Sequence, residues 1–208
     1  PSGPNLSHWP GNRTPAKWKQ DLSTSICMSY ARASAEEQRE FLSGAEVVLN
    51  DHYDTDGFGS LLAVLQPELA FAHEELLLAA AATGDFGAWV SPRAFAIDRM
   101  IARLADPASP IASQFRSLSG AEKSIARYRW LLEHARDVLA VRCIRHNKER
   151  IFGAAVDHEV VDHHAGGVHD DAVLGAARRE RTWLGLIRVP RRLTNSAGPS
   201  ACATPVRT

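Results

Sequence analysis

The chain alternates between short apolar runs and polar stretches, and the clearest transition lies in residues 46–60. Residues 47–49 form an apolar run of the length and composition of a short buried strand. A polar stretch follows, and a second apolar segment from about 58 to 65 has the composition of a helix. Gly57 and Gly59 lie where the polar stretch passes into this segment, and glycine would free the backbone to turn there. This order predicts a strand, a polar turn and a helix.

Helical periodicity recurs through the first two thirds of the chain. The predicted helices cover residues 34–42, 58–65, 68–83, 93–104 and 119–141. Ser34 and Ser119 are each followed three residues later by Glu, which is the spacing of a capping box. Gly84 is expected to end the helix over 68–83. Asp98 and its neighbour Arg99 are expected on the solvent face of their helix, the usual position of such charges.

The last third of the chain has a different pattern. Residues 151–161 are predicted to form one or two strands, residues 171–181 a helix and residues 182–189 a further strand. Together with the run at 47–49, these segments predict an α/β fold that is helix-rich, with a small and mainly parallel sheet. We expect a Pro/Gly-rich irregular arm at 1–20, a single domain at 21–189 and a disordered tail at 190–208.

Composition narrows the class of protein. The chain is 45% hydrophobic and 23% charged with a formal net charge of +0, which is ordinary for a soluble protein and gives no strong nucleic-acid signal. The longest apolar run, residues 76–82, is too short for a membrane span. Three widely separated cysteines and no secretory pattern at the N-terminus favour a cytoplasmic location, although an oligomeric state does not follow from any of this.

The polar stretch after the predicted strand carries candidate metal ligands. His52, Asp54 and Asp56 occupy alternate positions, so in an extended strand end they would project to the same side. One imidazole and two carboxylates are suitable ligands for a divalent cation. A calcium-binding EF-hand loop is excluded, because its twelfth position would be Ala63 rather than an acid. A turn without further function is the alternative, since Asp and Gly are ordinary turn residues.

Residues 52–60 resemble the first motif of the DHH phosphoesterase superfamily, His-x-Asp-x-Asp-Gly-x-x-Ser, and residues 162–164 resemble its later Asp-His-His. The resemblance implies a DHH-like α/β fold and a hydrolase of phosphodiesters or phosphoanhydrides that uses Mn²⁺ or Mg²⁺. Its partner would be a small phosphorylated substrate. It also implies the following roles: metal ligands His52, Asp54, Asp56, Asp85 and Asp162; catalytic donors His163 and His164; and phosphate contacts at the backbone of Gly166 and Gly167.

The N-terminal arm carries a second resemblance. Residues 8–15, followed by residues 21–24, resemble the opening of a family of uncharacterised bacterial proteins, and this likeness extends from about residue 5 to 105 and more weakly to 188. The family continues as a folded segment where this chain becomes Pro- and Ser-rich, which indicates a chain truncated or altered at its end. His8 and Arg13 are candidates to bind an anionic substrate. If the arm lies beside the metal motif, His8 and Asp21 join the site.

Two other function classes remain open on the sequence. One is a binding protein that keeps the fold, and the metal or another ligand, without catalytic activity. The other is a haloacid-dehalogenase-like phosphatase that uses Asp54 as its nucleophile. The second would need an acidic pair near the C-terminus, for which Asp170 and Asp171 are the candidates.

Overall fold

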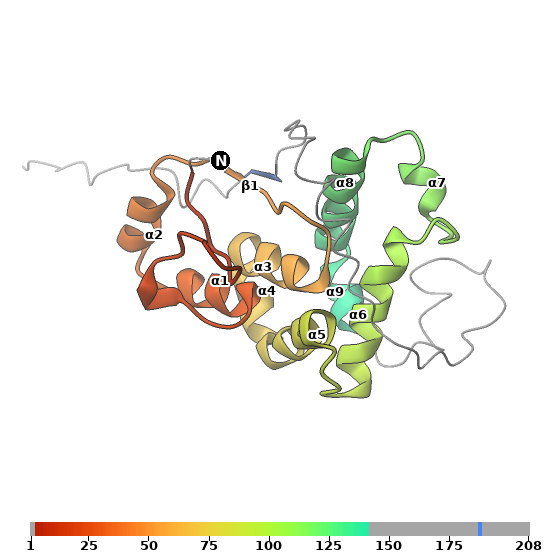
Figure 1. The fold of residues 1–208 in the computed structure, drawn as a ribbon, viewed down its shortest axis with the longest axis horizontal. Coiled ribbons are helices and arrows are strands. Elements are labelled where there is room, and N and C mark those ends of the chain that lie inside the picture. The colour runs from red at the N-terminus through yellow and green to blue at the C-terminus, as the bar shows by residue number, and fades with distance from the viewer. Residues whose placement is uncertain (1–2, 142–186, 189–208) are drawn as a thin grey trace, which may run out of the picture.

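The computed structural model describes residues 3–141 and the two residues 187–188 (Figure 1). Five residues expected at the site lie outside this part of the chain: Asp162, His163, His164, Gly166 and Gly167. The predicted helix at 171–181 and the tail at 190–208 lie outside it as well, as do the strands at 151–161 and most of 182–189. None of the described helices is long and apolar enough to cross a membrane.

Helices make up most of the described chain. Their bounds are η1 (Ala16–Trp18), α1 (Ser23–Arg32), α2 (Ala35–Leu42), α3 (Thr55–Leu65), α4 (Pro67–Ala72), α5 (Glu74–Phe86), α6 (Pro92–Ala105), α7 (Ala112–Phe115), α8 (Gly120–Glu133) and α9 (Ala135–Leu139), where η1 is a 3-10 helix. The two strands are β1 (Val47–Val48) and β2 (Ile187–Arg188). The helices predicted at 34–42 and 93–104 agree with α2 and α6, and those predicted at 68–83 and 119–141 are each divided in two.

The expected α/β fold with a mainly parallel sheet is wrong for the described residues. Their only strands are β1 and β2, which pair antiparallel with Val47 opposite Arg188 and Val48 opposite Ile187. The run 47–49 resembled a buried strand, but Val47 and Val48 are only partly buried and Leu49 is 38% exposed. Apolar helix faces form the core instead, so no sheet is needed to cover them.

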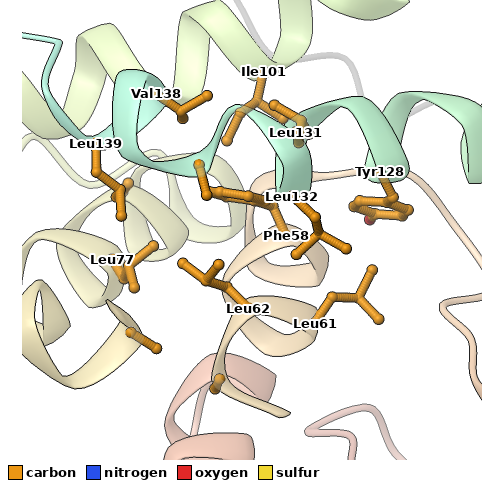
Figure 2. Packing of buried hydrophobic residues seen from close by; sticks show 14 of the residues in the cluster. Phe58, Leu61, Leu62, Leu77, Ile101, Tyr128, Leu131, Leu132, Val138 and Leu139 are labelled. Atoms are coloured by element: carbon orange, nitrogen blue, oxygen red, sulfur yellow. The ribbon is translucent and has the colours of Figure 1, made fainter. Parts of the chain in front are cut away.

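The core is built around α3, which lies centrally in Figure 1. Every residue of α3 from Thr55 to Val64 is buried, as expected of a helix that is apolar on nearly all sides. It packs against α1, α4, α5, α6 and α8. Figure 2 shows Phe58, Leu61 and Leu62 of this helix next to apolar side chains of α8 and α9, where Tyr128 and Leu131 are also buried.

The glycines near α3 and α5 do not have the positions expected of them. Gly57 and Gly59 lie inside α3 rather than in a turn before it, because Asp54 caps the helix three residues earlier than predicted. A Cβ atom at Gly59 would lie 2.3 Å from Oγ1 of Thr24 in α1, so glycine is required there for close helix packing. Helix α5 continues past Gly84 and ends at Phe86, where Gly87 takes the left-handed conformation with φ 63°.

Candidate metal site

Three segments that are distant in sequence bring one histidine and two carboxylates together. His8 comes from the N-terminal arm, Asp56 from the first turn of α3 and Asp85 from the last turn of α5. One ligand atom from each lies within 4.8 Å of the other two. Nδ1 of His8 is 3.3 Å from Oδ2 of Asp56, and its Nε2 is 3.6 Å from Oδ2 of Asp85. The imidazole therefore lies between two carboxylates.

Asp56 is held in place by the beginning of α1. Its Oδ2 accepts the backbone N–H of Ser23 at 2.9 Å and its Oδ1 that of Thr24 at 2.8 Å. The Thr24 hydroxyl donates in turn to the backbone carbonyl of Asp56 at 2.9 Å. Amide groups at a helix N-terminus stabilise a negative charge, so Asp56 both caps α1 and keeps a carboxylate at a defined position beside His8.

Asp85 is in a less favourable place for a negative charge. It lies in the last turn of α5, and the C-terminal end of a helix carries partial negative charge. Burial raises its pKa to about 6, with further contributions from the negative charges of Asp56 and Asp54, while His8 and His52 act in the opposite direction. An acidic group whose charged form is disfavoured overall by its surroundings is more typical of a functional site than of a structural contact.

His8 is positioned by the arm and by Ser23. Its Nδ1 lies 2.8 Å from the Ser23 hydroxyl oxygen, and its backbone N–H donates to the same oxygen at 3.3 Å. The ring of Trp9 stacks on His8 with centroids 5.6 Å apart and contacts His52 edge-on at 5.9 Å. The arm therefore packs across the site and places one imidazole inside it.

His52 and Asp54 form an ion pair beside these three residues. Nε2 of His52 contacts Oδ2 of Asp54, and its Nδ1 lies 2.7 Å from Oδ1 of Asp51. Hydrogen bonds to Asp51 and Asp54 raise the pKa of His52 to about 10, so the ring is protonated at neutral pH. Asp54 also caps α3, where its Oδ1 accepts the N–H of Gly57 at 2.6 Å.

The structure thus brings together some of the residues expected at the site and separates others. His8, Asp56 and Asp85 form one cluster, and His52 and Asp54 lie within electrostatic range of Asp85. Asp21 is exposed and is not part of the cluster. Arg13 is exposed too, and its guanidinium donates to the carbonyl of Gly3 at 3.1 Å within the arm. The alternate spacing of His52, Asp54 and Asp56 predicts a strand end, but in the structure Asp54 caps α3 and Asp56 lies in its first turn.

The sequence did not reveal the role of Tyr128 in α8, which supports the turn formed by residues 52–54. Its hydroxyl donates to the carbonyl of His52 at 2.9 Å and accepts the N–H of Asp54 at 3.0 Å. Burial raises the pKa of this phenol well above its ordinary value. The helical period of α8 identifies Tyr128 as a core residue, but only the packing of α8 on the start of α3 shows what its hydroxyl contacts.

Tyr128→Phe is expected to lower the free energy of unfolding by about 1–2 kcal/mol, because the partly buried N–H of Asp54 loses its acceptor. Tyr30→Phe is the matched control: the Tyr30 hydroxyl is buried and has no hydrogen-bond partner among the described residues, so its removal should be neutral or stabilising. Urea denaturation of both variants measures the difference. Equal effects would show that the Tyr128 hydroxyl does not support the turn.

Together these features define a helical protein with a His–Asp–Asp cluster where its N-terminal arm meets α3 and α5. Residues 1–181 match the model of a family of unknown function, DUF6687, and the chain belongs to that family. No curated protein and no solved structure matches it. None of these comparisons indicates the DHH phosphoesterase superfamily, so that resemblance depends on the motif residues alone.

Proposed function

We propose that this protein is a metal-dependent phosphoesterase, in which His8, Asp56 and Asp85 bind Mn²⁺ or Mg²⁺ and a small phosphorylated substrate is hydrolysed. The observation that carries the proposal is the convergence of these three side chains from three separate segments, with ligand atoms within 4.8 Å of one another. The motif resemblance at residues 52–60 supports the reaction class, and the cluster supports the metal.

The donor set suits a hard divalent cation. Two carboxylates and one imidazole provide oxygen and nitrogen ligands, and the two negative charges match a 2+ ion. All three side chains are largely shielded from solvent, with 17% of the His8, 4% of the Asp56 and 15% of the Asp85 side chain exposed. Burial is the main cause of the raised pKa of Asp85, and the negative charges of Asp56 and Asp54 add to it; a bound cation would favour the charged carboxylate in this place.

Each part of the chain has a distinct role in this proposal. The cation would lower the pKa of a bound water and neutralise charge on the phosphoryl oxygens. Asp56 keeps its position through the two N–H groups of α1, and His8 through Ser23. His52 is protonated at neutral pH, and both of its N–H groups are engaged with Asp51 and Asp54, so its role would be to place a positive charge beside the cluster that attracts an anionic phosphate group.

The two alternative functions, an inactive metal-binding protein and a haloacid-dehalogenase-like phosphatase, differ in how well they agree with the described residues. A metal-binding protein without activity would use the same three ligands, so only an activity measurement separates it from the hydrolase. A haloacid-dehalogenase-like phosphatase would need Asp54 at the end of a sheet strand. The described residues have no such sheet, and both carboxylate oxygens of Asp54 are engaged, one with Gly57 and the other with His52. That alternative loses its support.

Calorimetric titration with Mn²⁺ tests the proposal. The wild-type protein should bind the ion, and His8→Gln and Asp85→Asn should each weaken binding by more than about tenfold, because the first removes the imidazole and the second replaces a charged carboxylate by a neutral amide. Asp56→Ala should abolish binding too, but it is a less selective test because it also removes the cap of α1. Asp106→Asn is the matched control, since Asp106 lies at the end of α6 and pairs with Arg103.

The outcomes separate the candidate functions. Failure of folded wild-type protein to bind Mn²⁺ or Mg²⁺ would refute both the metal site and the phosphoesterase. Binding that His8→Gln and Asp85→Asn remove, together with hydrolysis of bis(p-nitrophenyl) phosphate or pyrophosphate, would support the enzyme. Such binding without hydrolysis across a panel of phosphodiesters and phosphoanhydrides would favour the inactive binding protein.

A further inference from the structure

A buried carboxylate contacts two of the helices that form the candidate metal site. Asp98 belongs to α6 and is only 3% exposed, although its sequence position suggested a solvent-facing residue. Its Oδ1 accepts the hydroxyl of Thr55 at 2.6 Å, and its Oδ2 lies 2.9 Å from Nε of Arg99. Burial of a charged group is unfavourable unless hydrogen bonds or an opposite charge compensate it. Asp98 has both.

Asp98 meets the two segments that carry the carboxylates of the site. Thr55 stands between Asp54 and Asp56 at the start of α3. On the other side, Gly84 immediately precedes Asp85, and a Cβ atom at Gly84 would lie 2.9 Å from Oδ1 of Asp98 and 3.3 Å from Cβ of Thr55. The start of α3, the end of α5 and the Asp98 side chain therefore converge at one point.

The contact at Gly84 depends on the absence of a side chain. Glycine inside a helix is less favourable than alanine, because it leaves the backbone more freedom to lose on folding. Gly84 lies within α5, and it does not end that helix, since Gly87 does. Close approach of α5 to Asp98 and Thr55 is the feature of the structure that explains a glycine at this position.

We infer that Asp98 is a positioning residue for metal binding, which holds the Asp54–Asp56 segment and the Asp85 segment at a set separation. This inference rests on the proposed metal site. Asp98 would not itself touch the ion, because it is not among the residues whose ligand atoms converge, and its two oxygens are engaged with Thr55 and Arg99. A hydrogen bond between a hydroxyl and a buried carboxylate is directional and strong in a poorly solvated place, so it sets the orientation of the α3 start more narrowly than apolar packing does.

The test compares Mn²⁺ affinity in two pairs of variants. Thr55→Val removes the hydroxyl at nearly constant shape, and Thr55→Ser keeps the hydroxyl. Asp98→Asn removes the charge, and Val138→Ala is a control for general loss of stability, because Val138 is a fully buried core residue of α9. We expect Thr55→Val and Asp98→Asn to weaken Mn²⁺ binding by about tenfold or more, as loss of outer-shell support does at other metal sites.

The control variants define which results would contradict the inference. Thr55→Ser should bind Mn²⁺ within about a factor of two of the wild type, since its hydroxyl remains to support the site. Val138→Ala should lower the melting temperature without changing affinity. If Thr55→Val and Asp98→Asn lower the melting temperature but bind Mn²⁺ as the wild type does, Asp98 has a structural role only. If the wild type itself binds no Mn²⁺, the proposed function falls and the inference falls with it.

Discussion

Gly57→Ala is expected to destabilise the folded protein by about 3 kcal/mol, the upper part of the range for overpacked sites. A Cβ atom at position 57 would lie 2.0 Å from Nδ2 of Asn50, 2.1 Å from the hydroxyl oxygen of Tyr128 and 2.8 Å from Oδ1 of Asp54. All three distances are shorter than the contacts that Cβ atoms make in folded proteins. The neighbours must move, and with them the turn that holds the candidate site.

The neighbours of Gly57 differ in how easily they can move. The amide of Asn50 is the end of a flexible side chain, so it can rotate away at small cost. Tyr128 cannot move as easily, because its ring is buried and packs on Tyr53 with centroids 5.0 Å apart. Its hydroxyl also donates a hydrogen bond to the carbonyl of His52. In an open helix, alanine in place of glycine would stabilise by about 1 kcal/mol. At position 57 the crowding against Tyr128 outweighs this gain, so the substitution is expected to destabilise the protein.

Urea denaturation of Gly57→Ala and Gly120→Ala measures this effect. Gly120 is the matched control, because it opens α8 and a Cβ atom there would have no neighbour within 4 Å. Gly120→Ala should therefore be neutral or slightly stabilising. Gly57→Ala should also reduce Mn²⁺ binding if the proposed site is correct. A Gly57→Ala protein as stable as the wild type would show that α3 does not approach Tyr128 this closely.

Asp85→Asn is expected to stabilise the metal-free protein at pH 7 by about 1–2 kcal/mol while it weakens metal binding. Burial and the charges of Asp56 and Asp54 raise the pKa of Asp85 from 3.8 to about 6 in the folded protein. The folded state therefore holds this proton at a pH where the unfolded chain has already released it. Stability falls as the pH rises from about 4 to 6, and the loss persists at higher pH. Partial solvent access reduces the value below the full effect of that pKa difference.

The pH dependence distinguishes this effect from a general change in stability. The gain from Asp85→Asn should be present at pH 7 and absent below pH 4, where the carboxyl group is neutral in both states. Asp106→Asn, at an exposed ion pair, should show no gain at pH 7. Addition of Mn²⁺ should stabilise the wild type and not Asp85→Asn, because only the wild type keeps the full ligand set. A loss of stability at pH 7 would contradict the raised pKa of Asp85.

Several local features of the protein are determined by sequence alone. The capping boxes at Ser34 and Ser119 begin α2 and α8 as predicted, and Ser91 followed by Pro92 begins α6. These signals act between residues three or four positions apart, so they do not depend on the rest of the fold. Of the three residues in the cluster, only Asp56 belongs to the alternately spaced set that predicts metal ligands in the sequence, whereas His8 and Asp85 lie far from that set along the chain.

Tertiary structure alone decided which of these residues meet and which face each side chain uses. The run 47–49 is too short for its pattern to distinguish a buried strand from a partly exposed one, and the apolar faces of the helices filled the core that a sheet would have covered. Gly57, Gly59 and Gly84 suggested turns, yet each lies in a helix at a point where another segment approaches closely. The burial of Asp98 is tolerated because Thr55 and Arg99 compensate its negative charge. The cluster of His8, Asp56 and Asp85 exists only because α1 and α5 pack on α3 while the arm packs across the site. Contacts of that kind join residues far apart in the chain, where sequence spacing carries no information about distance.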